Sequence, residues 1–191
     1  MRKGFIVAAL LVVVIGGLYA YLRLSVQGGG GAGEISLSGS EEPSSDTSMT
    51  REVDLYFADS SGRRLALERR EVAGTGRQGL LRAVIEELVK GPVGEDRVRT
   101  LPETTQVKAV YFQDATVWVD LGASIVDEHP GGAWTEVLTV YSIVNTITEN
   151  FTEVDQVQII VDGRERETLA GHVDISGPLP GRVQLLSGEW E

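Results

Sequence analysis

Two histidines are the side chains of this 191-residue sequence best suited to acid–base or metal chemistry. His129 follows Asp127 and Glu128, and two carboxylates beside an imidazole could hold a metal ion. Adjacent residues rarely converge on one ion, so a solvated loop that leads into a helix is the favoured interpretation. His172 lies close to Asp174 and could act as a general acid or base. A structural hydrogen bond in a turn explains this histidine more simply.

Two pairs of carboxylates offer a second kind of chemistry. Glycoside hydrolysis uses two carboxyl groups about 5 to 9.5 Å apart, which Glu153 with Asp155, or Asp120 with Asp162, could supply. The chain contains 28 Asp and Glu residues, so pairs of this kind are expected by coincidence. The pairs therefore predict no catalysis on their own.

The motifs of the common enzyme classes are missing from the sequence. There is no cysteine, no G-x-S-x-G turn, no Walker loop, no H-E-x-x-H and no G-x-G-x-x-G after a predicted strand. The four glycines at 28–31 have neither a strand before them nor a helix after them, as a phosphate-binding loop would require. An enzyme would need a cleft that gathers acids around His172. The sequence instead predicts a protein that is not an enzyme, with no catalytic, cofactor-binding or metal-binding residue.

Residues 1–23 have the pattern of a membrane anchor. Phe5 to Leu22 carries no charge and follows Arg2 and Lys3, and about 20 apolar residues cross a hydrocarbon core of about 30 Å. A cleaved signal peptide is the alternative, but its apolar part is usually about 7 to 15 residues long, and no A-x-A site follows here. The basic start keeps the N-terminus in the cytoplasm. We therefore expect a single-pass protein of the cell membrane whose folded part is extracytoplasmic.

The exported part of the chain is strongly acidic. Three of the 17 Lys and Arg residues, but none of the 28 acids, lie in residues 1–23, which leaves 14 basic residues against 28 acidic ones. Such a surface favours solubility and argues against a nucleic-acid partner. Residues 24–50 are rich in Gly, Ser, Thr and acids, which predicts a flexible linker. Without cysteine, the domain predicted at 51–191 must be stabilised by a hydrophobic core.

The first half of this domain predicts a hairpin and a helix. Apolar residues alternate over 53–57, turn residues follow, and an extended pattern resumes over 65–72. Thr75 and Gln78 have the spacing of a capping box, in which each side chain binds the other's backbone N–H. The helix that they predict ends at Gly91, and its apolar stripe consists of Leu81, Val84, Ile85 and Leu88.

The second half repeats this order. Strands are predicted at 107–112 and 116–121, and the short polar break between them predicts antiparallel pairing. Apolar positions from Trp134 to Phe151 predict a second helix. The other side of this helix is polar and could either form a contact surface or pack beneath a loop. Packing beneath a loop is the default interpretation. This polar side carries Thr135, Glu136, Thr139, Ser142 and Thr146.

A last strand and a loop-rich tail complete the prediction. The strand is expected at 157–161, where Asp162-Gly163 supplies a turn, and the tail beyond Leu169 is expected to contain one short strand near 183–186. The order is thus strand-strand-helix, strand-strand-helix, strand. This order suggests an α+β fold, with a mainly antiparallel sheet and two helices on one face, preceded by one transmembrane helix.

The order and spacing of several short stretches point to a known family. They are Tyr56-Phe57 and the stretches at 88–92, 101–107, 116–121, 140–149, 157–163 and 171–179. Together they resemble the GerMN domain of the sporulation and spore germination protein family, over about Val53 to Leu179. The chain departs from the family in having a single such domain and no lipobox cysteine, and in carrying Thr104 where the family often has glycine.

The resemblance implies an extracytoplasmic, membrane-tethered domain without catalytic residues, related in shape to modules that build rings or bridges in the cell envelope. In endospore formers such a protein helps to assemble a complex between two membranes. We therefore expect an interaction module whose partner is an envelope protein or a second copy of the chain. The alternative is a peptidoglycan-binding accessory to a wall hydrolase, since GerMN-like domains can accompany wall amidases.

Overall fold

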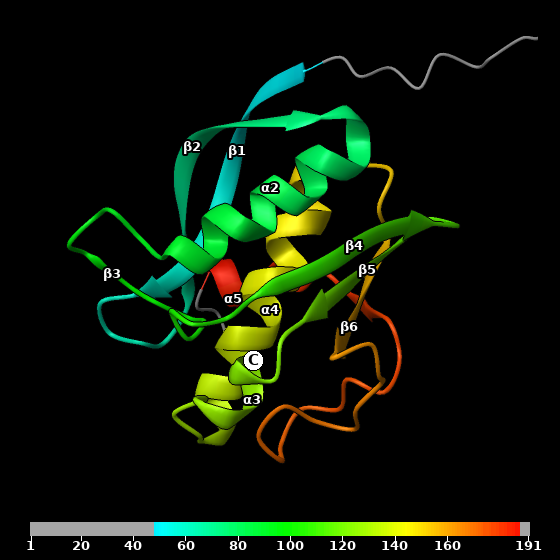
Figure 1. Cartoon of the computed structure of the whole chain (residues 1–191). Helices are drawn as coiled ribbons and strands as arrows, with labels where there is room; N and C mark the ends of the chain where they lie inside the picture. Colours follow the sequence, from blue (N-terminus) through cyan, green and yellow to red (C-terminus); the bar gives the residue numbers. More distant parts are fainter. Residues whose placement is uncertain (1–47, 188–191) are drawn as a thin grey trace, which may run out of the picture. The chain divides into compact units, whose positions relative to one another are not determined.

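The computed structural model describes residues 48–187, which form an α+β domain (Figure 1). The strands are β1 (Ser48–Asp59), β2 (Leu65–Thr75), β3 (Arg97–Val98), β4 (Val107–Gln113), β5 (Thr116–Leu121), β6 (Gln156–Val161) and β7 (Leu179–Pro180). The helices are α2 (Gly76–Lys90), α3 (Ser124–Asp127), α4 (Ala133–Asn150) and α5 (Gln184–Ser187). The strands form two sheets, of order β2-β1-β3 and β4-β5-β6-β7.

The predicted membrane anchor at 5–22 lies outside the described residues, as does nearly all of the predicted linker. Within 48–187, no helix combines the length and the apolar character needed to cross a membrane. Strand β1 begins at Ser48, inside the range predicted as linker, because Ser48 and Met49 pair with Thr75 and Gly74 of β2. The pairing with β2 is a long-range contact that composition alone does not indicate.

The first hairpin and its helix are confirmed. Strands β1 and β2 pair antiparallel, and α2 buries the predicted apolar stripe before Gly91, at φ 85°, ends it. The predicted capping box is wrong. Thr75 is the N-cap residue, but its side chain makes no capping hydrogen bond, and Gln78 Nε2 donates to the Val110 carbonyl at 2.8 Å instead. Tertiary contact with the neighbouring strand has replaced the local interaction.

The second hairpin is also confirmed, but the single predicted sheet is wrong. Strands β4 and β5 pair antiparallel around a turn in which Asp114 and Ala115 have positive φ. Strand β6 pairs parallel with β5, because α4 carries the chain across before β6 begins. Two sheets result because β1 is bordered by the short β3 and by α4, and not by a strand of the second hairpin.

Helix α4 meets the first sheet along the open edge of β1. Asn150 Oδ1 accepts from the Asp54 N–H at 2.9 Å, Asn150 Nδ2 donates to the Asp54 carbonyl at 2.7 Å, and Thr146 Oγ1 accepts from the Tyr56 N–H at 3.1 Å. The polar side of α4 is therefore packed, as the default interpretation had it, but against strand β1 and not only beneath a loop. Four of its five residues are buried, namely Glu136, Thr139, Ser142 and Thr146.

The tail differs from its prediction. Helix α5 covers the region near 183–186 where one short strand was expected. The tail does contain a two-residue strand, β7, but it lies before this region. The apolar run there is too short to separate a strand period from a helical one, and Leu185 is buried in the core as part of the helix. At Thr104, where the family often has glycine, φ is not positive, so the turn closed by Thr105 N–H and Pro102 O (3.1 Å) accommodates threonine.

Candidate functional site

The candidate site begins where β6 ends. After Val161 the chain reverses at Asp162-Gly163, whose φ values are 51° and 71°, and Val161 and Arg164 exchange two backbone hydrogen bonds of 2.9 and 3.1 Å. Asp120 Oδ1 of β5 accepts from the Gly163 N–H at 2.9 Å, and the Lys108 ammonium bonds the Asp162 carboxylate. The turn is therefore fixed on the second sheet.

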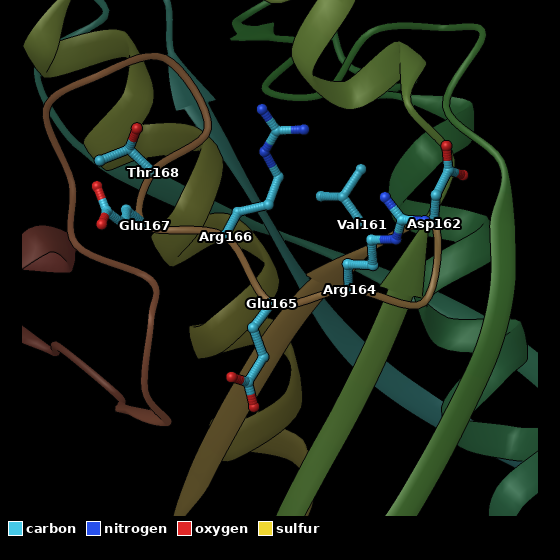
Figure 2. Close-up of a pocket in the computed structure, with 7 residues that line it drawn as sticks. All are labelled: Val161, Asp162, Arg164, Glu165, Arg166, Glu167 and Thr168. Atoms are coloured by element: carbon cyan, nitrogen blue, oxygen red, sulfur yellow. The ribbon is translucent and has the colours of Figure 1, made fainter.

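The segment that leaves this turn borders a hollow of about 710 Å³ (Figure 2). In Figure 2, the Arg166 and Glu165 side chains point to opposite sides of the segment, and the Arg164 guanidinium lies beside Asp162. A second hollow of about 380 Å³ shares Asp162 and is also lined by Lys108 of β4 and Glu128. The larger hollow is lined by Val161, Asp162, Arg164, Glu165, Arg166, Glu167 and Thr168.

Glu136 on α4 holds the other end of this segment. Its Oε1 accepts from the N–H groups of Leu169 at 2.9 Å and Ala170 at 2.8 Å. Its Oε2 accepts from the His172 N–H at 2.9 Å and is 3.1 Å from His172 Nδ1. The side chain is 0% exposed, and a carboxylate can be buried in this way because both oxygens are hydrogen-bonded. The loop is thus tied to the helix by one side chain.

Glu136 keeps its charge in this environment. Burial opposes ionisation, but the N–H groups of Ala170, His172 and Val173 and the His172 side chain outweigh it, so the pKa of Glu136 lies below its usual value. Because the carboxylate can only accept, His172 Nδ1 donates to it. The arrangement orients the imidazole as a carboxylate orients a catalytic histidine. In the described part of the chain, however, its contacts are those of a structural tie between loop and helix.

His129 is also held by structural bonds. The Gly131 N–H donates to Nδ1 at 3.0 Å, so in the neutral ring the proton is on Nε2, which is 3.0 Å from Thr139 Oγ1. Thr139 in turn donates to the Thr100 carbonyl at 2.7 Å. Burial lowers the pKa of His129, although the charge of Glu136 raises it. A loop leading into a helix is confirmed, but the predicted solvation is wrong for His129, whose ring is partly buried.

Three of the four residues in the candidate carboxylate pairs bond other groups. Asp120 and Asp162 meet at the same turn, but Gly163 and Lys108 occupy their oxygens. Glu153 instead approaches Arg77 at 3.6 Å. His172 takes Glu136 as its partner, whereas Asp174 accepts from the N–H and hydroxyl of Ser176. Across residues 48–187, no three His, Asp or Glu side chains are placed to hold a metal ion.

Sequence reasoning missed the role of Glu136. The residue was grouped with the polar side of its helix, and its partners lie 33 to 36 residues further along the chain. One signal was present. Residues 133–150 contain no Lys or Arg, and Glu136 lies in line with the small hydroxyl residues Thr139, Ser142 and Thr146. An acidic residue in line with small hydroxyl residues, on a helix without basic residues, indicates that this polar face is buried and not exposed to solvent.

Stability is expected to fall in two stages as the pH is lowered. The folded chain holds the pKa of His129 below 6.5 because of burial, so below that pH the unfolded chain binds more protons than the folded one. Below 4.5 the same applies to Glu136 and Glu68, where loop N–H bonds prevail over burial and lower both pKa values. Urea midpoints measured at about pH 7.5, 5.5 and 3.5 should decrease in that order. A urea midpoint that is higher at pH 5.5 than at pH 7.5 would contradict the effect expected from His129.

Comparison with known proteins gives the fold and the family. The Germane family, described as sporulation and spore germination, matches residues 54–167. A Clostridium perfringens protein provisionally named a lipoprotein is 23% identical with a TM-score of 0.52, over 71% of this chain and 87% of its own. The tandem GerMN domains of the sporulation protein GerM from Bacillus subtilis are 19% identical with a TM-score of 0.55, over 72% of this chain and 48% of theirs.

The first GerMN domain of the same Bacillus subtilis protein is 20% identical with a TM-score of 0.54, over 68% of this chain and 97% of its own. No curated protein matches the chain. At these identities the solved structures show a shared fold. Since the family match covers more than half of the sequence, the chain belongs to the Germane family of sporulation and spore germination proteins and carries a GerMN domain.

Proposed function

We propose that this chain is a non-enzymatic, membrane-anchored module of the GerMN type, which binds an envelope protein or a second copy of itself outside the cytoplasm. One observation carries the proposal: the side chains best suited to chemistry are engaged in structural bonds. His172 and Glu136 tie a loop to α4, and His129 bonds its own loop and Thr139. The domain thus has a rigid surface to offer a partner.

The family and the neighbours support the envelope location. Residues 1–23 are proposed as the anchor and 24–50 as the linker that leads to the folded domain. The Clostridium perfringens neighbour, provisionally named a lipoprotein, supports a membrane-associated extracytoplasmic domain. GerM is a sporulation protein, so assembly of an envelope complex during sporulation is the process that we propose for this chain.

Cross-linking in intact cells, followed by affinity purification of the full chain from solubilised membranes, tests the proposal. We expect cross-linked species heavier than the monomer, containing an envelope protein or a differently tagged second copy. A variant that lacks residues 5–22 is the control, because it should stay in the cytoplasm and lose these species. Recovery of monomer alone under every growth and sporulation condition would contradict the proposal.

Peptidoglycan binding is a second candidate, favoured by the hollow beside β6. Its volume of about 710 Å³ falls within the range of about 300 to 1,000 Å³ that small-ligand sites occupy. A short peptide of the cell wall would fit this volume, and binding it would require no catalytic residue. Co-sedimentation of the full chain with insoluble peptidoglycan separates this candidate from the first, since a chain that stays in the supernatant excludes it.

A further inference from the structure

We propose that the hollow beside β6 binds a peptide carboxylate through Arg164 and Arg166. The inference rests on the proposed function, because it assigns the chemistry by which the module recognises a partner. The chain contains more acidic than basic residues. Two neighbouring arginines that bond no carboxylate are therefore unusual in this domain.

Most basic side chains of the described residues are engaged. Eight of the 14 Lys and Arg residues form an ion pair with a carboxylate. Arg51, Arg99 and Arg182 contact a carbonyl or an aromatic ring. The remaining three are Arg63, Arg164 and Arg166, and the last two both line the hollow.

The backbone keeps the two arginines available. Arg164 lies within electrostatic range of Asp162, but Lys108 already bonds that carboxylate. Glu165 lies between the arginines in sequence, and its side chain points away from that of Arg166 in Figure 2. In the described part of the chain, neither guanidinium forms a hydrogen bond or an ion pair with a carboxylate, although Arg164 remains close enough to Asp162 to lower its pKa.

The walls of the hollow are held at both ends. Asp120 fixes the turn through the Gly163 N–H, and Glu136 fixes Leu169 and Ala170 just beyond Thr168. A site supported in this way loses little conformational freedom when a ligand binds. Each guanidinium can offer a carboxylate two parallel N–H donors.

Charge selects a carboxylate over other anions. The lining carries three acids, Asp162, Glu165 and Glu167, against two arginines. A carboxylate with one negative charge is repelled less by these acids than a phosphate, which can carry two, or a polyanion. A side-chain or C-terminal carboxylate of a peptide fits both the charge and the volume. Its source is either an envelope protein or the peptide of the cell wall.

Isothermal titration of the full chain in detergent micelles tests the site. The probe is the peptide GAAE with an acetylated start and an amidated end, which carries one carboxylate, and its control has glutamine in place of the glutamate. We expect saturable binding of the acidic peptide that weakens about tenfold in Arg166→Ala and in Arg164→Ala, the effect of losing one charged hydrogen-bonding group. Arg166→Lys should retain part of the affinity, and Arg63→Ala should bind like the parent chain. Circular dichroism melts check that each variant folds.

The outcomes separate the sources and the two proposals. Soluble muropeptides that bind and compete with the acidic peptide support the hollow with a wall source, and acidic-peptide binding without muropeptide binding supports it with a protein source. No saturable binding of either probe, equal loss in Arg63→Ala, or tighter binding of inorganic phosphate would overturn it. If the acidic peptide alone binds the parent chain but the Arg164→Ala/Arg166→Ala chain still captures its envelope partner, the hollow inference fails and the proposed function stands. If the parent chain captures no partner, the proposed function is contradicted, whether or not the peptides bind.

Discussion

A Glu136→Gln variant is expected to lose about 3 kcal/mol of unfolding free energy, one of the two largest effects that we predict for a single substitution. Each oxygen of Glu136 accepts from two donors. An amide replaces one acceptor oxygen with a donor, so the two donors on that side, at least one of them only partly buried, lose their partner at a cost of about 1 to 3 kcal/mol each. Urea unfolding at neutral pH, followed by circular dichroism, measures the loss.

Glu86→Gln is the matched control for this variant. Glu86 pairs with Arg82 at 2.7 Å on the exposed side of α2, and both side chains are more than 40% exposed. Exposed pairs of this spacing contribute only about 0.3 to 0.5 kcal/mol, so the control should change little. If Glu136→Gln changed the unfolding free energy no more than the control, the loop would not depend on the buried carboxylate.

The same variant should loosen the candidate site. The loop that Glu136 holds follows directly after Thr168 in the wall of the hollow. Hydrogen exchange of the Leu169 and Ala170 amides should therefore accelerate more than that of the β5 amides, because local opening exposes the loop first. The stability of the loop and the shape of the hollow depend on one interaction.

The local elements could be predicted because their signals are local. The turn after β1 is stabilised by Asp59, whose carboxylate accepts from the Ser61 hydroxyl at 2.7 Å and the Arg63 N–H at 3.1 Å. Gly91 ends α2 in the left-handed region that glycine favours. Strand and helix periods then fix which side chains enter the core. These features require no knowledge of the rest of the chain.

The arrangement of the elements could not be predicted in the same way. The Gln78 side chain bonds a carbonyl of β4 and not its own helix end, and Thr146 and Asn150 bond residues of β1 that lie 90 and 96 positions earlier in the chain. The division into two sheets follows from these long-range bonds, which no period in the sequence reports. The site was missed for the same reason, since Glu136 and the arginines acquire their roles only through the loop at 164–172.

The acidic composition also has a structural meaning that the count of charges does not give. Glu68 accepts from the N–H groups of Val93 and Gly94, as Glu136 does from its loop, and Asp120 accepts from Gly163. Each of these carboxylates satisfies backbone donors that a loop would otherwise leave to water. Some of the acids therefore organise loops in addition to keeping the protein soluble.

Asn150→Leu is the second substitution with a large expected effect, a loss of about 2 to 3 kcal/mol of unfolding free energy. The leucine has the same branching and the same number of heavy atoms but removes both hydrogen bonds to Asp54, whose N–H and carbonyl are half-buried at the edge of β1. Water cannot fully replace the amide there, so both backbone groups lose a partner. Urea unfolding at neutral pH measures the effect, and Gln156→Leu, at an exposed position without side-chain bonds in the described residues, is the control.

The loss at Asn150 should also appear as association between chains. An unpaired strand edge is a template on which another chain can add a strand, and Thr146 would then be the one side chain of α4 still bonded to the β1 backbone. Size-exclusion chromatography should therefore show larger species for Asn150→Leu that Gln156→Leu does not form. A monomeric Asn150→Leu with parent stability would mean that the packing of α4, and not its polar side chains, closes the edge of the sheet.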